Sequence, residues 1–258
     1  MGQRLRKRLV DREKSRPSLF WLLGGIIVPV LGIFVKIEIL GEENLPEEGP
    51  FVLAPNHYSE IDPLIVAVAV WRLGRAPRFM AKESLFRVPV LGPAMRGTGM
   101  VPVARASSSV AAKQTLDTAT HLAEHGAGVI VYPEGTLTRD PDLWPMRGKT
   151  GAARLALVGD IPLIPVAQWG AQEVFPRYGR MRFWPLRKPI RFLVGAPLDI
   201  SEERAQANLA WVQTRVTARL MDRIAELLAQ LRGIPAPAVR WNPHDHGQKE
   251  TGRLEPES

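Results

Sequence analysis

The chain has 258 residues, a length typical of one domain with short appendages. It contains no cysteine, which excludes a disulfide framework, a thiolate nucleophile and a cysteine metal site. The formal net charge of +8 indicates an anionic partner, such as phospholipid head groups, a phosphorylated substrate or nucleic acid. The few aromatic residues show no stacking pattern among the basic ones, and no nucleic-acid-binding motif is present, so we do not expect nucleic acid. The sequence also predicts no metal site and no cofactor.

The first 35 residues combine a basic cluster with an apolar run. Residues 4–16 hold seven Lys or Arg, and residues 19–35 carry no charge. The pair resembles a signal peptide, but no small-residue cleavage site follows. The apolar run is borderline in length for a transmembrane helix. It is also interrupted by four residues that break or kink helices, Gly24, Gly25, Pro29 and Gly32.

We therefore expect residues 1–35 to form a helical segment that associates with the membrane without a simple crossing. A broken, re-entrant or interfacial segment would dip into the cytoplasmic leaflet, and the basic cluster would add attraction to anionic head groups. The alternative is a buried core helix packed on the rest of the domain.

Residues 36–232 alternate between short apolar runs and longer helical patterns, which predicts a single main domain. The alternation is typical of an α/β sandwich, with a mixed, largely parallel sheet flanked by helices. The predicted strands are 36–40, 51–54, 77–81, 99–103, 128–132, 162–167 and 190–195, and the predicted helices are 63–73, 107–125, 149–158 and 201–232.

The last predicted helix has clear end signals, with Ser201 as N-cap and Gly233 just past its end. The following residues, up to Ser258, begin with prolines and continue as polar chain. Residues 233–258 are therefore predicted to be a mobile tail.

The segment 54–64 carries the first chemical signal, because His57 and Asp62 stand there with four residues between them. A strand is predicted before this segment and a helix after it, and side chains in such loops usually meet ligands. A histidine can take a proton from a hydroxyl, and a carboxylate can fix its tautomer and stabilise the imidazolium. However, Asp62 before Pro63 also fits a helix N-cap. The spacing alone favours this structural interpretation.

Further blocks follow His57 and Asp62 in a fixed order. They read FMAKESLF at 79–86, GMVPVAR at 99–105, YPEGT at 132–136 and IPLIPV at 161–166. Together with Asn56-His57-x4-Asp62, these blocks resemble the motifs of the glycerolipid acyltransferases, the family of 1-acyl-glycerol-3-phosphate (lysophosphatidic acid) acyltransferases. The resemblance covers residues 36–200, most of the chain, and the ordered set is far more specific than any one block.

The resemblance implies an enzyme that transfers a fatty acyl group from acyl-CoA or acyl-carrier protein to 1-acyl-glycerol 3-phosphate, giving phosphatidic acid in phospholipid biosynthesis. His57 would be the general base and Asp62 would orient it. By the same resemblance, the substrate-binding residues would be Asn56, Lys82, Arg105, Glu134, Gly135 and Thr136. Such an enzyme would work at the cytoplasmic face of the cell membrane, as a peripheral or monotopic protein on an anionic surface.

One position departs from the family pattern. An arginine normally follows the threonine of the third block, and here that position is Leu137. The missing cation could be supplied by Arg139, the next basic residue, or by Arg147 or Lys149. This departure leaves the acceptor open between lysophosphatidic acid, glycerol 3-phosphate, another lysophospholipid and a glycolipid.

Two other classes of function remain open on the sequence. A thioester hydrolase would use His57 to activate water instead of an acceptor hydroxyl. A non-catalytic basic membrane adaptor would need none of the ordered blocks, which argue against it.

Overall fold

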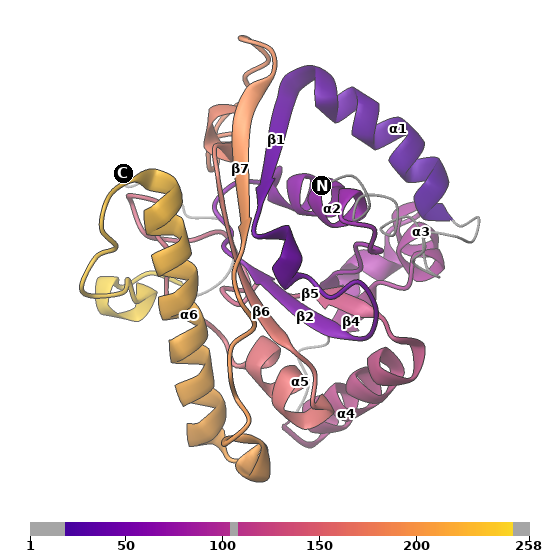
Figure 1. Ribbon diagram of the computed structural model, residues 1–258, viewed down its shortest axis with the longest axis vertical. Coiled ribbons are helices and arrows are strands. Elements are labelled where there is room, and N and C mark those ends of the chain that lie inside the picture. Colours follow the sequence, from indigo (N-terminus) through magenta and orange to yellow (C-terminus); the bar gives the residue numbers. More distant parts are fainter. Residues whose placement is uncertain (1–18, 104–107, 250–258) are drawn as a thin grey trace.

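The computed structural model describes residues 19–103 and 108–249, and a five-stranded sheet forms its centre (Figure 1). The strand order is β1-β7-β6-β2-β5. Pairing is parallel throughout this sheet except between β6 and β7, which are antiparallel. The strands are β1 (Val35–Leu40), β2 (Phe51–Pro55), β5 (Gly128–Ile130), β6 (Leu163–Trp169) and β7 (Lys188–Val194). The predicted mixed, largely parallel sheet is confirmed.

A short second sheet pairs β3 (Met80–Lys82) with β4 (Val101–Val103) in parallel. Each of the predicted strands overlaps an observed one. The predicted helices also appear, as α2 (Asp62–Arg72), α4 (Ser108–His125), α5 (Gly151–Gly159) and α6 (Ala210–Arg232). The sequence did not predict α3 (Leu91–Gly97), because this seven-residue helix contains Gly92 and Pro93 and is too short to show a helical period.

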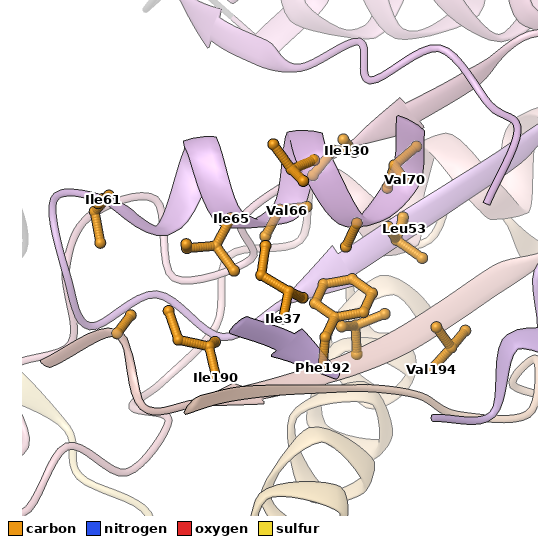
Figure 2. Packing of buried hydrophobic residues seen from close by; sticks show 14 of the residues in the cluster. Ile37, Leu53, Ile61, Ile65, Val66, Val70, Ile130, Ile190, Phe192 and Val194 are labelled. Atoms are coloured by element: carbon orange, nitrogen blue, oxygen red, sulfur yellow. The ribbon is translucent and has the colours of Figure 1, made fainter. Parts of the chain in front are cut away.

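Helices cover both faces of the main sheet. Successive residues of a strand point to opposite faces, so apolar residues at neighbouring positions are buried under different helices. On β2, Phe51 and Leu53 face α2, and Val52 and Ala54 face the helices α4, α5 and α6. Figure 2 shows the first of these layers, in which residues of α2 pack on apolar side chains of β1, β2 and β7. The alternating pattern of the buried strands therefore builds two apolar layers around one sheet.

The start of the last helix differs from the prediction. It begins at Ala210, because Ser201 is held in a turn where both its backbone N–H and its hydroxyl donate to Asp199 Oδ1. Residues 204–206 then form a separate 3-10 turn. The apolar residues that recur at helical spacing from Val212 to Leu231 are nevertheless buried, as in a core helix.

The predicted mobile tail is corrected for residues 234–249, which pack beside α6. The backbone N–H of Arg147 donates to Trp241 O at 2.9 Å, and Arg240 pairs with Asp222 of α6. The ring of Trp241 stacks on His246. These contacts involve polar and aromatic residues without periodic spacing, so the sequence pattern does not reveal them.

The N-terminal apolar run forms α1 (Leu19–Phe34), a continuous helix that includes Pro29. One face of α1 packs on the domain, where Phe20 and Trp21 contact the ring of Trp71 in α2. The opposite face, with Leu22, Ile26, Val30 and Ile33, is exposed. In the part of the chain that the structure describes, no helix is both long and apolar enough to span a membrane. The basic cluster at residues 4–16 lies outside the described residues.

Arg75, just after α2, is a buried cation that joins three chain segments. Its guanidinium donates to the carbonyls of Pro46, Gly49 and Gly126 at 2.7–2.8 Å.

We expect Arg75→Met to lower the free energy of unfolding by about 3 kcal/mol or more, because buried carbonyls lose charged donors. Urea unfolding measures the change. Arg87→Met, at an exposed salt bridge with Glu83, is the control and should cost under about 0.5 kcal/mol. Equal effects would contradict this role for Arg75.

Candidate active site

The structure brings His57 and Asp62 together at the end of β2. His57 Nδ1 lies 3.0 Å from Asp62 Oδ2. The same carboxylate oxygen accepts the backbone N–H groups of Tyr58 at 2.7 Å and Ser59 at 2.8 Å. The loop therefore closes around the carboxylate of Asp62, which is fully buried.

This arrangement decides between the two interpretations of Asp62. No side chain caps the first turn of α2, so Asp62 does not act as the helix N-cap that its position before Pro63 suggested. Its hydrogen bonds run backwards into the loop and to the imidazole. Burial raises the pKa of Asp62, and the hydrogen bonds from His57, Ser59 and Tyr58 offset part of that rise by favouring the carboxylate.

The imidazole of His57 is held by two neighbours, Asp62 at Nδ1 and Tyr132 against one face of the ring. One side of the ring stacks on Tyr132, with centroids 4.1 Å apart. Because Nδ1 is engaged by Asp62, Nε2 is the ring nitrogen left for a ligand. When Nδ1 carries the proton and donates it to Asp62, Nε2 is an acceptor and can serve as a base.

Glu134 holds the backbone of the same loop. Its Oε1 accepts the N–H of His57 at 3.0 Å, and its Oε2 accepts the N–H of Met146 at 3.0 Å. The carbonyl of His57 in turn accepts the N–H of Thr138 at 2.6 Å. Glu134 is fully buried, and this burial raises its pKa to about 8. Glu134 therefore positions His57 from behind, whereas the resemblance implied contact with substrate.

Asn56 also has a positioning role in the structure. Its side-chain amide donates to Gln168 O at 3.2 Å and accepts the Gln168 N–H at 2.8 Å. These two bonds join the ends of β2 and β6, and Asn56 is buried. Asn56 is not among the residues that line the apolar cavity in front of His57, and its contact with substrate stays a prediction.

An apolar cavity of about 1040 Å³ opens in front of His57. Its walls come from segments that are distant in sequence: the inner face of α1, the outer face of α2, the helix α3 and the chain from 131 to 137 apart from Glu134. Representative wall residues are Phe20, Leu23, Ile27, Leu64, Trp71, Met95 and Met100. In the described ranges, the formally charged side chains on the wall are Lys82 and Lys149.

Only some of the residues expected to bind substrate line this cavity. Lys82, Gly135 and Thr136 line the cavity with His57, and Leu137 joins them. Arg105 lies outside the described residues.

Arg139, one of the residues expected to replace the missing phosphate ligand at Leu137, is almost completely buried and is not on the cavity wall, so the structure does not place it where that ligand is needed. The chain turns away from the cavity at Thr138–Asp140. There Arg177 donates to the carbonyls of Thr138 and Asp140, and Asp140 Oδ1 accepts the N–H groups of Asp142 and Trp144. Arg139 is part of this closed turn.

Lys149 reaches the cavity instead. Its backbone N–H donates to Pro133 O at 2.7 Å, and its side chain passes beside Gly135. A Cβ at Gly135 would stand 3.2 Å from Lys149 Cδ, and φ at Gly135 is +70°. Glycine is therefore suited to this position for its backbone angle and for the close approach of the lysine. The sequence offered Lys149 only as one of several basic residues after Leu137.

Comparison with known proteins assigns the family. Residues 36–169 match the family model described as Acyltransferase. The chain belongs to the Acyltransferase family.

Its relatives include the protein named 1-acyl-sn-glycerol-3-phosphate acyltransferase BAT2, chloroplastic, of Brassica napus, which is 33% identical over 69% of this chain and 51% of its own length. A protein named 1-acyl-sn-glycerol-3-phosphate acyltransferase in Bacillus subtilis is 28% identical over 77% of this chain and 91% of its own length. This chain spans about half the length of the Brassica relative and of a similar protein in Arabidopsis thaliana.

Among solved structures, the fold resembles that of the 1-acyl-sn-glycerophosphate (LPA) acyltransferase PlsC from Thermotoga maritima. The TM-score is 0.59 at 23% identity, and the match covers 92% of this chain and 88% of the other. The likeness in fold therefore extends over nearly the whole chain, beyond the residues that match the family model.

The raised pKa of Glu134 gives this acyltransferase-family chain a testable pH dependence. Between pH 4.5, the ordinary pKa of the group, and about 8, the folded state keeps a proton that the unfolded state releases. The free energy of unfolding should therefore fall as pH rises through this window, by up to about 1.4 kcal/mol per unit from this group. Glu134→Gln should remove that slope, as measured by urea unfolding at several pH values.

The loss of one acceptor in Glu134→Gln adds a destabilisation that does not change with pH, so the slope is the informative quantity. Glu226→Gln, at an exposed salt bridge on α6, is the matched control and should keep the wild-type slope. A Glu134→Gln variant with the wild-type slope would contradict the protonated carboxyl.

Proposed function

We propose that this protein is an acyltransferase that moves a fatty acyl group from acyl-CoA or acyl-carrier protein to the free hydroxyl of 1-acylglycerol 3-phosphate, giving phosphatidic acid. The observation that carries the proposal is the contact of 3.0 Å between His57 Nδ1 and Asp62 Oδ2, placed beside an apolar cavity of about 1040 Å³. The names of the relatives support 1-acylglycerol 3-phosphate as the acceptor.

In the proposed reaction, the acceptor hydroxyl attacks the thioester carbonyl as His57 Nε2 takes its proton. Asp62 stabilises the imidazolium that results. The tetrahedral intermediate then collapses, the C–S bond breaks, and His57 returns the proton to the departing thiolate. The new C–O ester bond completes the transfer, and no covalent enzyme intermediate is needed. Because Glu134 and Thr138 already hold the backbone of His57, the base requires little rearrangement.

The cavity matches the chemistry of the acyl substrates. Its walls are mostly apolar, and its volume is at the upper end of the range of roughly 300–1,000 Å³ that is usual for ligand pockets. We propose that it holds fatty acyl chain, with the carbonyl carbon next to His57. The inner face of α1 would then contact the chain directly.

The acceptor phosphate needs a cation near Gly135 and Thr136. We propose Lys149 for this position, because its side chain lies against Gly135 on the cavity wall where Leu137 replaces the family arginine. Lys82 lies on the same wall, and Arg105 stays a prediction. Acylation of glycerol 3-phosphate, another lysophospholipid or a glycolipid is the alternative that the replacement at Leu137 keeps open.

We further propose that the protein works at the cytoplasmic face of the cell membrane, as a peripheral or monotopic protein. The acceptor and product are amphiphiles that sit in a bilayer. The exposed face of α1 is apolar, and the sequence before α1 is basic, which is a combination that favours an anionic membrane surface.

The first test of the proposed reaction is thiol release from palmitoyl-CoA by the purified protein, with and without lysophosphatidic acid. Thiol release that requires the acceptor supports transfer, whereas release without the acceptor indicates a hydrolase. No thiol release at all supports a non-catalytic membrane adaptor.

His57→Ala should lower turnover by about 10²–10⁴-fold, because the hydroxyl loses its base. His125→Ala, at an exposed histidine of α4, is the control and should keep wild-type turnover. A folded His57→Ala protein with normal turnover would refute the mechanism.

The phosphate site is tested by steady-state kinetics on Lys149 variants. Lys149→Ala should raise the KM for lysophosphatidic acid by about 10-fold or more and leave the KM for acyl-CoA nearly unchanged, because one charge-assisted contact is lost. Lys149→Arg should restore much of the loss. Lys113→Ala, at an exposed lysine of α4, is the control. An equal rise in both KM values would count against a phosphate role for Lys149.

A further inference from the structure

The loop that leads into β7 exposes large apolar side chains. Within residues 180–187, which we call the aromatic loop, Phe183 is 56% exposed, Trp184 80% and Leu186 47%. Single exposed apolar residues are normal, but a contiguous cluster with two aromatic rings marks an interaction site. None of these three residues lines the cavity in front of His57.

The aromatic loop is continuous with the exposed face of α1. The ring of Phe183 packs on Phe34 at the end of α1, with centroids 5.5 Å apart. The backbone N–H of Arg187 donates to Ile33 O at 3.3 Å. In Figure 1 the chain that enters β7 projects at the same end of the molecule as the junction of α1 and β1. The two segments therefore form one apolar surface, although about 150 residues separate them in sequence.

The charges of the aromatic loop have a single sign. Arg180, Arg182 and Arg187 are exposed and alternate with the apolar residues. The sequence has no acidic residue between Glu173 and Asp199. Aromatic side chains interleaved with arginine match the boundary of an anionic bilayer, where rings sit among the head groups and guanidinium groups bind phosphate.

The base of the aromatic loop is firmly anchored. The buried Lys188 donates through Nζ to Glu173 O at 2.8 Å and to Arg182 O at 2.5 Å. The N–H of Arg182 donates to Val174 O at 2.7 Å. These bonds tie both ends of the aromatic loop together, so its apolar side chains are held outward rather than folded onto the sheet.

We propose that the aromatic loop is a second membrane-binding element, which inserts Phe183, Trp184 and Leu186 into an anionic bilayer beside the exposed face of α1. The inference rests on the proposed membrane location and adds a contact that the N-terminal segment does not provide. Two contacts fix the orientation of the protein on the bilayer. They place α1 between lipid on its outer face and the cavity on its inner face.

Vesicle sedimentation of the full chain tests the proposal, with phosphatidylcholine vesicles that contain or lack phosphatidylglycerol. The double variant Phe183→Ser/Trp184→Ser should bind anionic vesicles at least about tenfold more weakly than wild type, because both inserting rings are lost. Trp211→Ser is the matched control, since Trp211 is 55% exposed and lies beside Arg215, but in the first turn of α6. It should bind like wild type. Circular dichroism and urea unfolding check that each variant is folded.

A second measurement does not depend on removing apolar surface. Brominated lipids should quench part of the tryptophan fluorescence of the wild type. Trp184→Phe should lose the share of that quenching that comes from Trp184, and Trp211→Phe should keep it; Trp21 of α1, which is 51% exposed, is expected to supply the remainder. Unchanged quenching in Trp184→Phe would overturn insertion of the aromatic loop.

The outcomes separate this inference from the proposals on which it rests. If the wild type binds no vesicles, the membrane location fails and the inference fails with it. If the wild type binds and the double variant binds equally well, only the inference fails. If the double variant instead converts a dimer to a monomer with unchanged vesicle binding, the surface joins two copies of the chain and the proposal is overturned. Turnover of a soluble short-chain acceptor should be the same in wild type and double variant, and its absence in both would concern the acyl-transfer proposal alone.

Discussion

The buried carboxylate of Asp62 is the constraint on which the rest of the site depends. A carboxylate without water around it is costly unless donors surround it. Here one oxygen accepts from two backbone N–H groups and one imidazole nitrogen. These three donors hold the loop between β2 and α2 around Asp62 Oδ2, and the contact with Nδ1 leaves Nε2 of His57 for the cavity. The stability of the loop and the position of the base therefore have the same physical cause.

A second buried carboxyl group, that of Glu134, supports the same loop from the neighbouring strand. Glu134 joins the backbone of His57 to that of Met146, so the loops after β2 and β5 are bound to each other. The two strands are parallel neighbours, and the loops after parallel strands meet at one edge of the sheet. The chain lines the cavity as far as Leu137, turns away from it, and returns to it at Lys149. In this way the sheet topology brings a base, its support and a candidate phosphate cation into one region.

The sequence predicted the parts of the site that are local, and failed where the outcome depends on distant contacts. His57 and Asp62 are close because a short loop joins them, so their spacing carried the information. Lys149 and Arg139 looked alike in sequence, since both are basic residues shortly after Leu137. Only Lys149 reaches the cavity. Arg139 lies in a turn closed by Arg177, whereas Lys149 is anchored to Pro133 beside Gly135. Neither contact has a local pattern.

By itself the sequence determined the α/β class, the order of strands and helices, and the loop that carries His57. These features follow from the alternation of apolar residues and from motifs of a few neighbouring residues. Only the tertiary structure decided that α1, α2 and α3 enclose one cavity, that Asn56 and Glu134 position rather than line it, and that residues 234–249 pack beside α6. It also joined the aromatic loop to α1. The physical reason is that packing and burial bring together residues far apart in the chain, and no local pattern encodes which of them will meet.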